Sequence, residues 1–138
     1  MTPATPIPFV RNFLFVAGLV FVATGLVFLV SPGLVVAVRE AGTPSADAIN
    51  DVRAIYGGLE AGLGAFFLYA AFRPSSYEAG AVLAIAVGGV AALSRFAGFA
   101  LVSGTPAAHL GYGALDLVGV VFGVLAMRRV AAGRSNAS

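Results

Sequence analysis

Cysteine and lysine are absent from this chain of 138 residues, and histidine occurs once, as His109. Without cysteine the protein forms no disulfide and offers neither a thiolate metal ligand nor a cysteine nucleophile. All eight basic residues are arginines, and their scatter along the chain defines no basic face for a nucleic acid. The glycine-rich fingerprints of phosphate and dinucleotide binding and the Gly-x-Ser-x-Gly elbow are missing as well. We therefore expect no metal, no cofactor, no nucleic-acid partner and no catalytic residue that a motif identifies.

Charge is also scarce. Only 10% of the residues are charged, whereas 59% are hydrophobic, and the mean hydropathy is +0.97. A soluble domain usually carries about 25% charged residues. The chain therefore has too little polar surface for water, and the lipid bilayer is its natural solvent. Its length suits one transmembrane domain, residues 1–138.

Four apolar segments are long enough to cross a bilayer, which takes about 20 residues of helix. They cover residues 12–30, 53–72, 79–102 and 110–127. The second helix can start earlier, in the Ser-Ala-Asp-Ala-Ile-Asn-Asp segment, with Ser45 as a candidate N-cap. The sequence thus predicts an all-α, integral membrane four-helix bundle with up-down-up-down topology.

The arginines predict the orientation of the chain. Four spans place both termini on one side of the membrane, together with five arginines: Arg11, Arg73, Arg128, Arg129 and Arg134. Only Arg39 and Arg53 fall on the other side. Because positive residues concentrate in cytoplasmic segments, we expect cytoplasmic termini, an external loop over residues 31–52 and a cytoplasmic polar tail over residues 128–138.

Glycines recur inside the spans at spacings that let helix backbones approach closely. Gly58 and Gly62 form one such pair, and Gly119 and Gly123 form another. The spacing predicts helix packing within the chain, and contact with another copy or a membrane protein partner is the alternative.

Three charged residues lie inside the spans, and this is the feature of the sequence with most bearing on function. Glu60, Arg95 and Asp116 each lie about 9–10 Å from the outer end of their helix, at 1.5 Å per residue. Charges at such depth are rare and normally face the bundle interior. Because an arginine fork can engage two carboxylates, we expect an electrostatic cluster of Glu60 and Asp116 around Arg95, with Arg53 nearby.

A short phrase occurs twice. Tyr-Gly-Gly-Leu-Glu at 56–60 is echoed by Tyr-Gly-Ala-Leu-Asp at 112–116, so that Tyr56 matches Tyr112 and Arg53 matches His109. The echo indicates two parallel helical hairpin repeats, although the first and third helices align poorly. Coincidence between common membrane residues is the alternative. Tyr56, Tyr112 and His109 would stand near the outer mouth of the charged cluster.

These residues resemble a known family. The segments Asp-Val-Arg-Ala-Ile-Tyr-Gly-Gly and Ser-Arg-Phe-Ala-Gly-Phe-Ala-Leu-Val-Ser-Gly-Thr-Pro, with an acidic residue and an arginine pair in the fourth span, resemble the bacterial membrane family of domain of unknown function 4345 over residues 10–130. Ser94 stands where the pattern has glycine, which leaves Arg95 in place. The resemblance implies four helices, a place in the bacterial inner membrane and the polar positions Arg53, Tyr56, Glu60 and Arg95, and it implies no activity. A looser similarity to DoxX-like four-helix proteins has no specific phrase to support it.

Three functions fit these observations. In the first, the charges only fix helix arrangement, and the protein is a structural or accessory membrane subunit. In the second, Glu60, Arg95 and Asp116 form a carrier or binding site for a small solute, a proton or a lipid headgroup. In the third, His109 and the two carboxylates serve a membrane enzyme. A dry, fully paired cluster favours the first function, and a cavity that reaches the charges favours the second.

Overall fold

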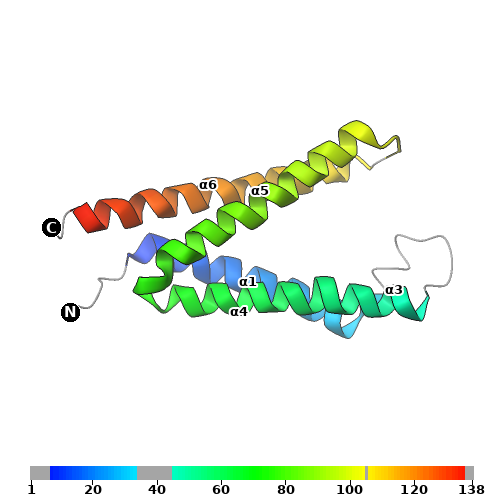
Figure 1. Cartoon of the computed structure of the whole chain (residues 1–138), viewed down its shortest axis with the longest axis horizontal. Coiled ribbons are helices and arrows are strands. Elements are labelled where there is room, and N and C mark those ends of the chain that lie inside the picture. Colours follow the sequence, from blue (N-terminus) through cyan, green and yellow to red (C-terminus); the bar gives the residue numbers. More distant parts are fainter. Residues whose placement is uncertain (1–6, 34–44, 105, 136–138) are drawn as a thin grey trace.

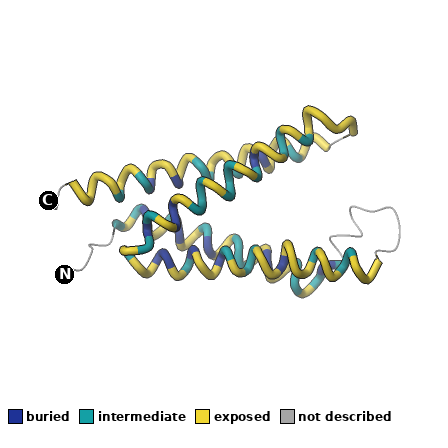
Figure 2. The backbone as a smooth tube through the Cα atoms, viewed as in Figure 1, coloured by how far each residue is buried: buried dark blue, intermediate teal, exposed yellow. Residues whose placement is uncertain are grey.

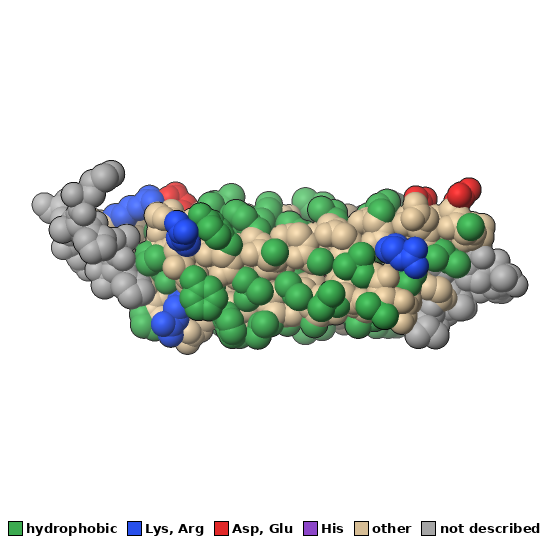
Figure 3. Space-filling model, turned by 90° about the horizontal axis from the view of Figure 1, so that it is seen from below, with side chains coloured by type: hydrophobic (Ala, Val, Ile, Leu, Met, Phe, Trp, Pro, Cys, Tyr) green, Lys and Arg blue, Asp and Glu red, His purple; other side chains and the backbone are tan. Residues whose placement is uncertain are grey.

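The structure is a computed structural model that describes residues 7–33, 45–104 and 106–135 (Figure 1). The described part is all-helical and contains four helices that are long and apolar enough to cross a membrane, which confirms the predicted fold class. Hydrophobic side chains cover the middle of the face seen in Figure 3, and charged side chains lie toward its two ends. This is the surface of a multi-pass membrane protein.

The second helix runs without a break from residue 46 to residue 71. Ser45 is its N-cap, since the serine hydroxyl accepts a hydrogen bond from the backbone N–H of Ala48 at 3.1 Å. This confirms the early start of the second helix. The elements are α1 (Pro8–Val30), α3 (Ala46–Asp51), the π-helix η1 (Val52–Gly58), α4 (Leu59–Ala71), the short 3₁₀ helix η2 (Pro74–Ser76), α5 (Tyr77–Leu101) and α6 (Ala108–Ser135).

Two predicted boundaries differ from the structure. Helix α6 continues to Ser135, so that much of the expected polar tail is helical, and Arg134 in this extension pairs with Glu78 at the start of α5. Residues 46–51 of the expected external loop form α3. The apolar segment 33–38 of that loop lies almost wholly outside the described residues.

The helices form two antiparallel hairpins. The first hairpin consists of α1 with η1 and α4, and the second consists of α5 with α6. Helices pack along most of their length within a hairpin, whereas contacts between the hairpins are few. The hairpins lie close together near the 71–77 turn and diverge toward η1 and the 101–108 turn (Figure 1). We call these the closed end and the open end.

Glycines set the close approach inside the first hairpin. A Cβ at Gly25 on α1 would lie 2.5 Å from the Ala61 backbone nitrogen, and one at Gly64 on α4 would lie 2.5 Å from the Val22 backbone nitrogen. Backbone therefore meets backbone at both positions, and any side chain would force the helices apart. This is the small-residue packing that membrane helices use in place of a hydrophobic driving force.

The predicted glycine pairs are only partly correct. A Cβ at Gly62 would meet nothing within 4 Å, and one at Gly58 would meet only a backbone oxygen of its own helix at 4.0 Å. Gly119 is equally open, whereas Gly123 packs against Ile85 of α5. The packing prediction was wrong for Gly58 and Gly62, because spacing alone does not say which face of a helix meets its neighbour. The contact face of the second helix runs instead through Gly57 and Gly64.

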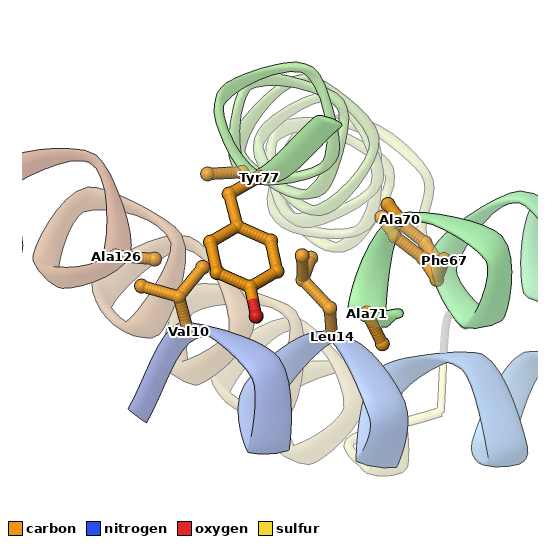
Figure 4. Close-up of a cluster of buried hydrophobic side chains, with 8 residues drawn as sticks. Val10, Leu14, Phe67, Ala70, Ala71, Tyr77 and Ala126 are labelled. Atoms are coloured by element: carbon orange, nitrogen blue, oxygen red, sulfur yellow. The ribbon is translucent and has the colours of Figure 1, made fainter. Parts of the chain in front are cut away.

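The hydrophobic core joins the hairpins at the closed end (Figures 2 and 4). It contains Val10, Leu14, Phe67, Ala70, Ala71, Tyr77, Ala81 and Ala126, which come from all four long helices. Tyr77 is 2% exposed, and its hydroxyl makes no hydrogen bond within the described part of the chain. None of these core side chains lies beyond Phe67 toward the open end, so the hairpins separate there.

Candidate functional site

A cavity of about 510 Å³ lies between the hairpins at the open end. It is lined by Tyr56 of η1, by residues of α5 and its end, and by the start of α6: Ala91, Ser94, Arg95, Gly98, Val102, Pro106 and His109. Ligand cavities typically have 300–1,000 Å³. The polar groups of the lining are a guanidinium, an imidazole and two hydroxyls, which gives the cavity several hydrogen-bond donors.

Arg95 and Asp116 form an ion pair across the second hairpin. The Arg95 Nε donates to Asp116 Oδ2 at 2.8 Å, and the two side chains are 34% and 25% exposed. The small residue Gly88 lets the backbones approach here, since a Cβ on it would lie 3.0 Å from the Asp116 carbonyl oxygen. The pair occupies one nitrogen of Arg95, and the two terminal amino groups make no hydrogen bond to any residue in the described ranges.

The Tyr112 ring of α6 contacts the guanidinium, and the His109 ring packs behind it. The Arg95 Cζ lies 5.4 Å from the centroid of the Tyr112 ring, a cation–π distance. The His109 ring packs edge-on against Tyr112 at 6.1 Å. His109, Tyr112 and Asp116 follow one another at helical spacing, so α6 presents all three to the same side as Arg95. The second hairpin alone therefore builds and orients the cationic group.

Glu60 belongs to the first hairpin, and it is not one of the residues that line the cavity. Positions 56, 60 and 67 share one face of the second helix. Tyr56 on this face packs against Phe28 of α1 at 5.6 Å and lines the cavity, and Phe67 on the same face packs against Phe21 at 5.5 Å and is buried in the core. Glu60 lies between these two contacts and is half-buried. No ion pair or hydrogen bond joins it to another described residue.

The depths of Glu60 and Arg95 are similar. Ala70 and Gly80 lie at the same height along the bundle, since a Cβ on Gly80 would lie 3.2 Å from the Ala70 Cβ. They serve as a common reference for heights in the two hairpins. From there, residue 60 lies about 15 Å and residue 91 about 16 Å toward the open end. The Arg95 side chain leaves α5 toward the helix N-terminus and so points back to the level of residue 91. Residue 60 and the Arg95 guanidinium therefore lie at about the same height in opposite hairpins.

Arg53 has a different role from the one predicted. Its Nε donates to the Leu29 carbonyl oxygen at 3.3 Å, at the C-terminal end of α1, where backbone carbonyls lack helical partners. A cation at this position also complements the helix dipole. Arg53 thus joins the two helices of the first hairpin, and it does not lie in an ion pair with Glu60.

The π-helix explains why the side chains of Arg53 and Tyr56 point in different directions. Both residues lie in η1, where the Leu59 N–H bonds to the Ala54 carbonyl, five residues back. A π turn holds more residues than the 3.6 of an α turn, so Arg53 and Tyr56 are further apart around the axis than the usual i, i+3 pair. Arg53 accordingly reaches the C-terminal end of α1, while Tyr56 lines the cavity and packs against Phe28. Such segments occur frequently at functional sites.

The structure brings together most of the predicted site residues, but not as one cluster. The second hairpin holds a connected group of Arg95, Asp116, Tyr112 and His109. From the first hairpin, Tyr56 lines the same cavity, whereas Glu60 does not line it. Ser94 contributes a hydroxyl to the cavity that sequence reasoning missed, because its only signal was adjacency to Arg95. Within the described residues, no three His, Asp or Glu side chains lie close enough to hold a metal ion.

The family model described as Domain of unknown function (DUF4345) matches residues 9–127 of the chain. No curated protein and no solved structure matches it. The match covers every residue of the cavity lining and the Arg95–Asp116 pair.

Proposed function

This chain belongs to the DUF4345 family, and for this member we propose a binding function: the cleft between the hairpins holds a small molecule with an acidic group. The single observation that supports this most is the state of Arg95. The Nε of its guanidinium is paired with Asp116, while its terminal amino groups have no hydrogen-bond partner in the described part of the chain, and Arg95 lines an open cavity of about 510 Å³. Guanidinium groups recognise carboxylates and phosphates with such donors.

The alternative role, an accessory subunit whose charges only fix the helices, is less well supported. That role requires the charges to be paired with one another, because an unpaired charge in a membrane span is costly. Here Glu60 has no partner among the described residues, and Arg95 keeps free donors beside a cavity. Both features suit a site that is completed by a ligand.

Hexyl phosphate is a suitable probe for the site. The chain contains no tryptophan, so a single introduced tryptophan supplies all of the tryptophan fluorescence. In the Tyr56→Trp variant in detergent, we expect saturable changes in tryptophan emission on titration with hexyl phosphate. Adding Asp116→Asn should tighten binding, since Asp116 then no longer competes for Arg95. Changing Arg95→Gln as well should weaken it by about tenfold or more, as expected for charged hydrogen bonds of about 1.5–3 kcal/mol.

The matched control is Tyr69→Trp, an exposed position at the closed end beside Arg73. Its emission should not change in a saturable way. Equal responses of the two reporters, or equal affinities with and without Arg95, would favour the accessory role.

We further propose that the closed end and both termini face the cytoplasm of a bacterial inner membrane, on the strength of the arginine distribution. Ser45 and Ser75 are both exposed and lie at opposite ends of the second helix. In intact cells, a membrane-impermeant maleimide should label Ser45→Cys and spare Ser75→Cys until the cells are opened. Labelling of Ser75→Cys alone would reverse the proposed orientation.

A further inference from the structure

The cavity follows the last turns of α5 from the open end into the span. Its lining residues on α5 share one face of the helix: Ala91, Ser94, Arg95, Gly98 and Val102. From residue 91 to residue 102 is about 16 Å along the axis. The end of α5 and the start of α6 line its outer end, beside the 101–108 turn. The cavity therefore joins the outer end of the second hairpin to the interior of the bundle.

The Arg95–Asp116 pair lies at the inner end of this cavity. A Cβ on Gly88 would lie 3.0 Å from the Asp116 carbonyl oxygen, and the Arg95 side chain points back to the level of residue 91. Helix α5 has 25 residues and is about 38 Å long, against about 30 Å of hydrocarbon. The level of residue 91 is then about 11 Å inside the hydrocarbon boundary. A phospholipid headgroup stays at that boundary, so an acid that reaches the guanidinium is a small, water-soluble molecule.

The pair has no positive charge to spare for such an acid. The Asp116 carboxylate makes one hydrogen bond to a described residue, from the Nε of Arg95 to its Oδ2. An anion on the terminal amino groups would lie beside this carboxylate, so that two negative charges share one guanidinium. An excess charge at this depth is costly. When two acids share a site away from water, the favoured state is the one in which one of them holds a proton.

We propose that the cleft binds a small, water-soluble organic acid together with one proton, which Asp116 takes up from the water at the open end. The protonated Asp116 side chain carries no charge, so Arg95 is left to the anion and the occupied site is neutral. This rests on the proposed binding function and adds the proton as a second ligand.

Few other groups compete for this proton. The titratable and charged groups around Asp116 are Arg95 from α5, His109 and Tyr112 from α6, and Arg53, Tyr56 and Glu60 from the second helix. The described part of α1 adds only Arg11, at the closed end. Arginines keep their proton, and tyrosine hydroxyls are neutral at ordinary pH. The competitors are therefore His109, which lines the cavity, and Glu60, which does not line it.

Hexanesulfonate tests the proposal, because its sulfonate is negative at every working pH and any pH dependence then comes from the protein. In the Tyr56→Trp variant, the dissociation constant should fall by up to about tenfold for each unit by which the pH is lowered from about pH 8 to about pH 6, the limit for one coupled proton. Adding Asp116→Asn should give tight binding at every pH, since an amide takes up no proton. His109→Gln and Glu60→Gln, each added alone, should leave the pH dependence in place.

Calorimetric titration of the wild-type chain gives the same answer without a substitution. In two buffers of different ionisation enthalpy, the binding heats should differ as expected for uptake of up to about one proton per sulfonate. Binding without proton uptake overturns the inference and leaves the acidic-group site standing. Loss of the pH dependence in His109→Gln or Glu60→Gln, with Asp116→Asn still pH-dependent, overturns the role of Asp116. If neither hexanesulfonate nor hexyl phosphate binds at any pH, the proposed function fails as well.

Discussion

Gly64→Leu is expected to lower the free energy of unfolding of the detergent-solubilised protein by about 3 kcal/mol or more, or to prevent folding altogether. A Cβ at Gly64 would lie 2.5 Å from the Val22 nitrogen, 2.7 Å from Val22 Cγ2 and 2.8 Å from the Gly18 carbonyl oxygen. Two of these three atoms belong to the backbone of α1, so no rotamer change relieves the clash. The loss should appear as a fall of roughly 10 °C in the midpoint of thermal unfolding, followed by size-exclusion chromatography after heating.

Gly62→Leu is the matched control, two residues away on the same helix. Nothing lies within 4 Å of a Cβ at this position, so the change should alter the midpoint little. A larger loss at Gly62 than at Gly64 would mean that the open face of the helix at Gly62 is a packed interface. Gly25→Leu, on the other side of the contact, should resemble Gly64→Leu.

Arg95→Leu is expected to be the most destabilising change among the charged residues of the spans. It leaves the Asp116 carboxylate without its partner, and removing one member of a buried pair typically costs about 3–5 kcal/mol. The Arg95 and Asp116 side chains are 34% and 25% exposed, so we expect a loss below that range, about 2–3 kcal/mol. Asp116→Asn in the same chain should recover much of the loss, because fewer charges then lack a partner.

A double-mutant cycle distinguishes the contacts of Arg95. The coupling free energy between Arg95→Leu and Asp116→Asn should be about 2 kcal/mol, whereas that between Arg95→Leu and Glu60→Gln should stay within about 0.5 kcal/mol in detergent without lipid. Thermal or denaturant unfolding of the four members of each cycle gives both values. Strong coupling to Glu60 would show that the hairpins close over the pair, and strict additivity with Asp116 would show that the ion pair does not form.

The sequence predicts the helices well because hydropathy and length largely decide what spans a bilayer. It predicts the end of α6 poorly, since Arg134 gains its partner Glu78 only when α5 and α6 are side by side. Ser45 was accessible to sequence reasoning because an N-cap is a local interaction. Helix ends that depend on contact with another helix could not be predicted from the sequence.

The candidate site was likewise predictable only in the features that depend on a single helix. That Glu60, Arg95 and Asp116 reach one depth follows from counting residues along helices. Which carboxylate meets Arg95 depends on which helices form a hairpin, and α5 packs with α6 far more than with α4. Arg53 could not be placed from the sequence because a π-helix changes the angular positions of the residues within it.

The divergence of the hairpins gives the protein the shape of a wedge, narrow at the closed end and wide at the open end (Figure 1). Such a molecule displaces more area from one leaflet of the bilayer than from the other. Lateral pressure in the leaflet at the open end therefore works against the divergence, and tension in that leaflet works in its favour. We therefore expect the width of the gap between the hairpins to depend on the mechanical state of the membrane.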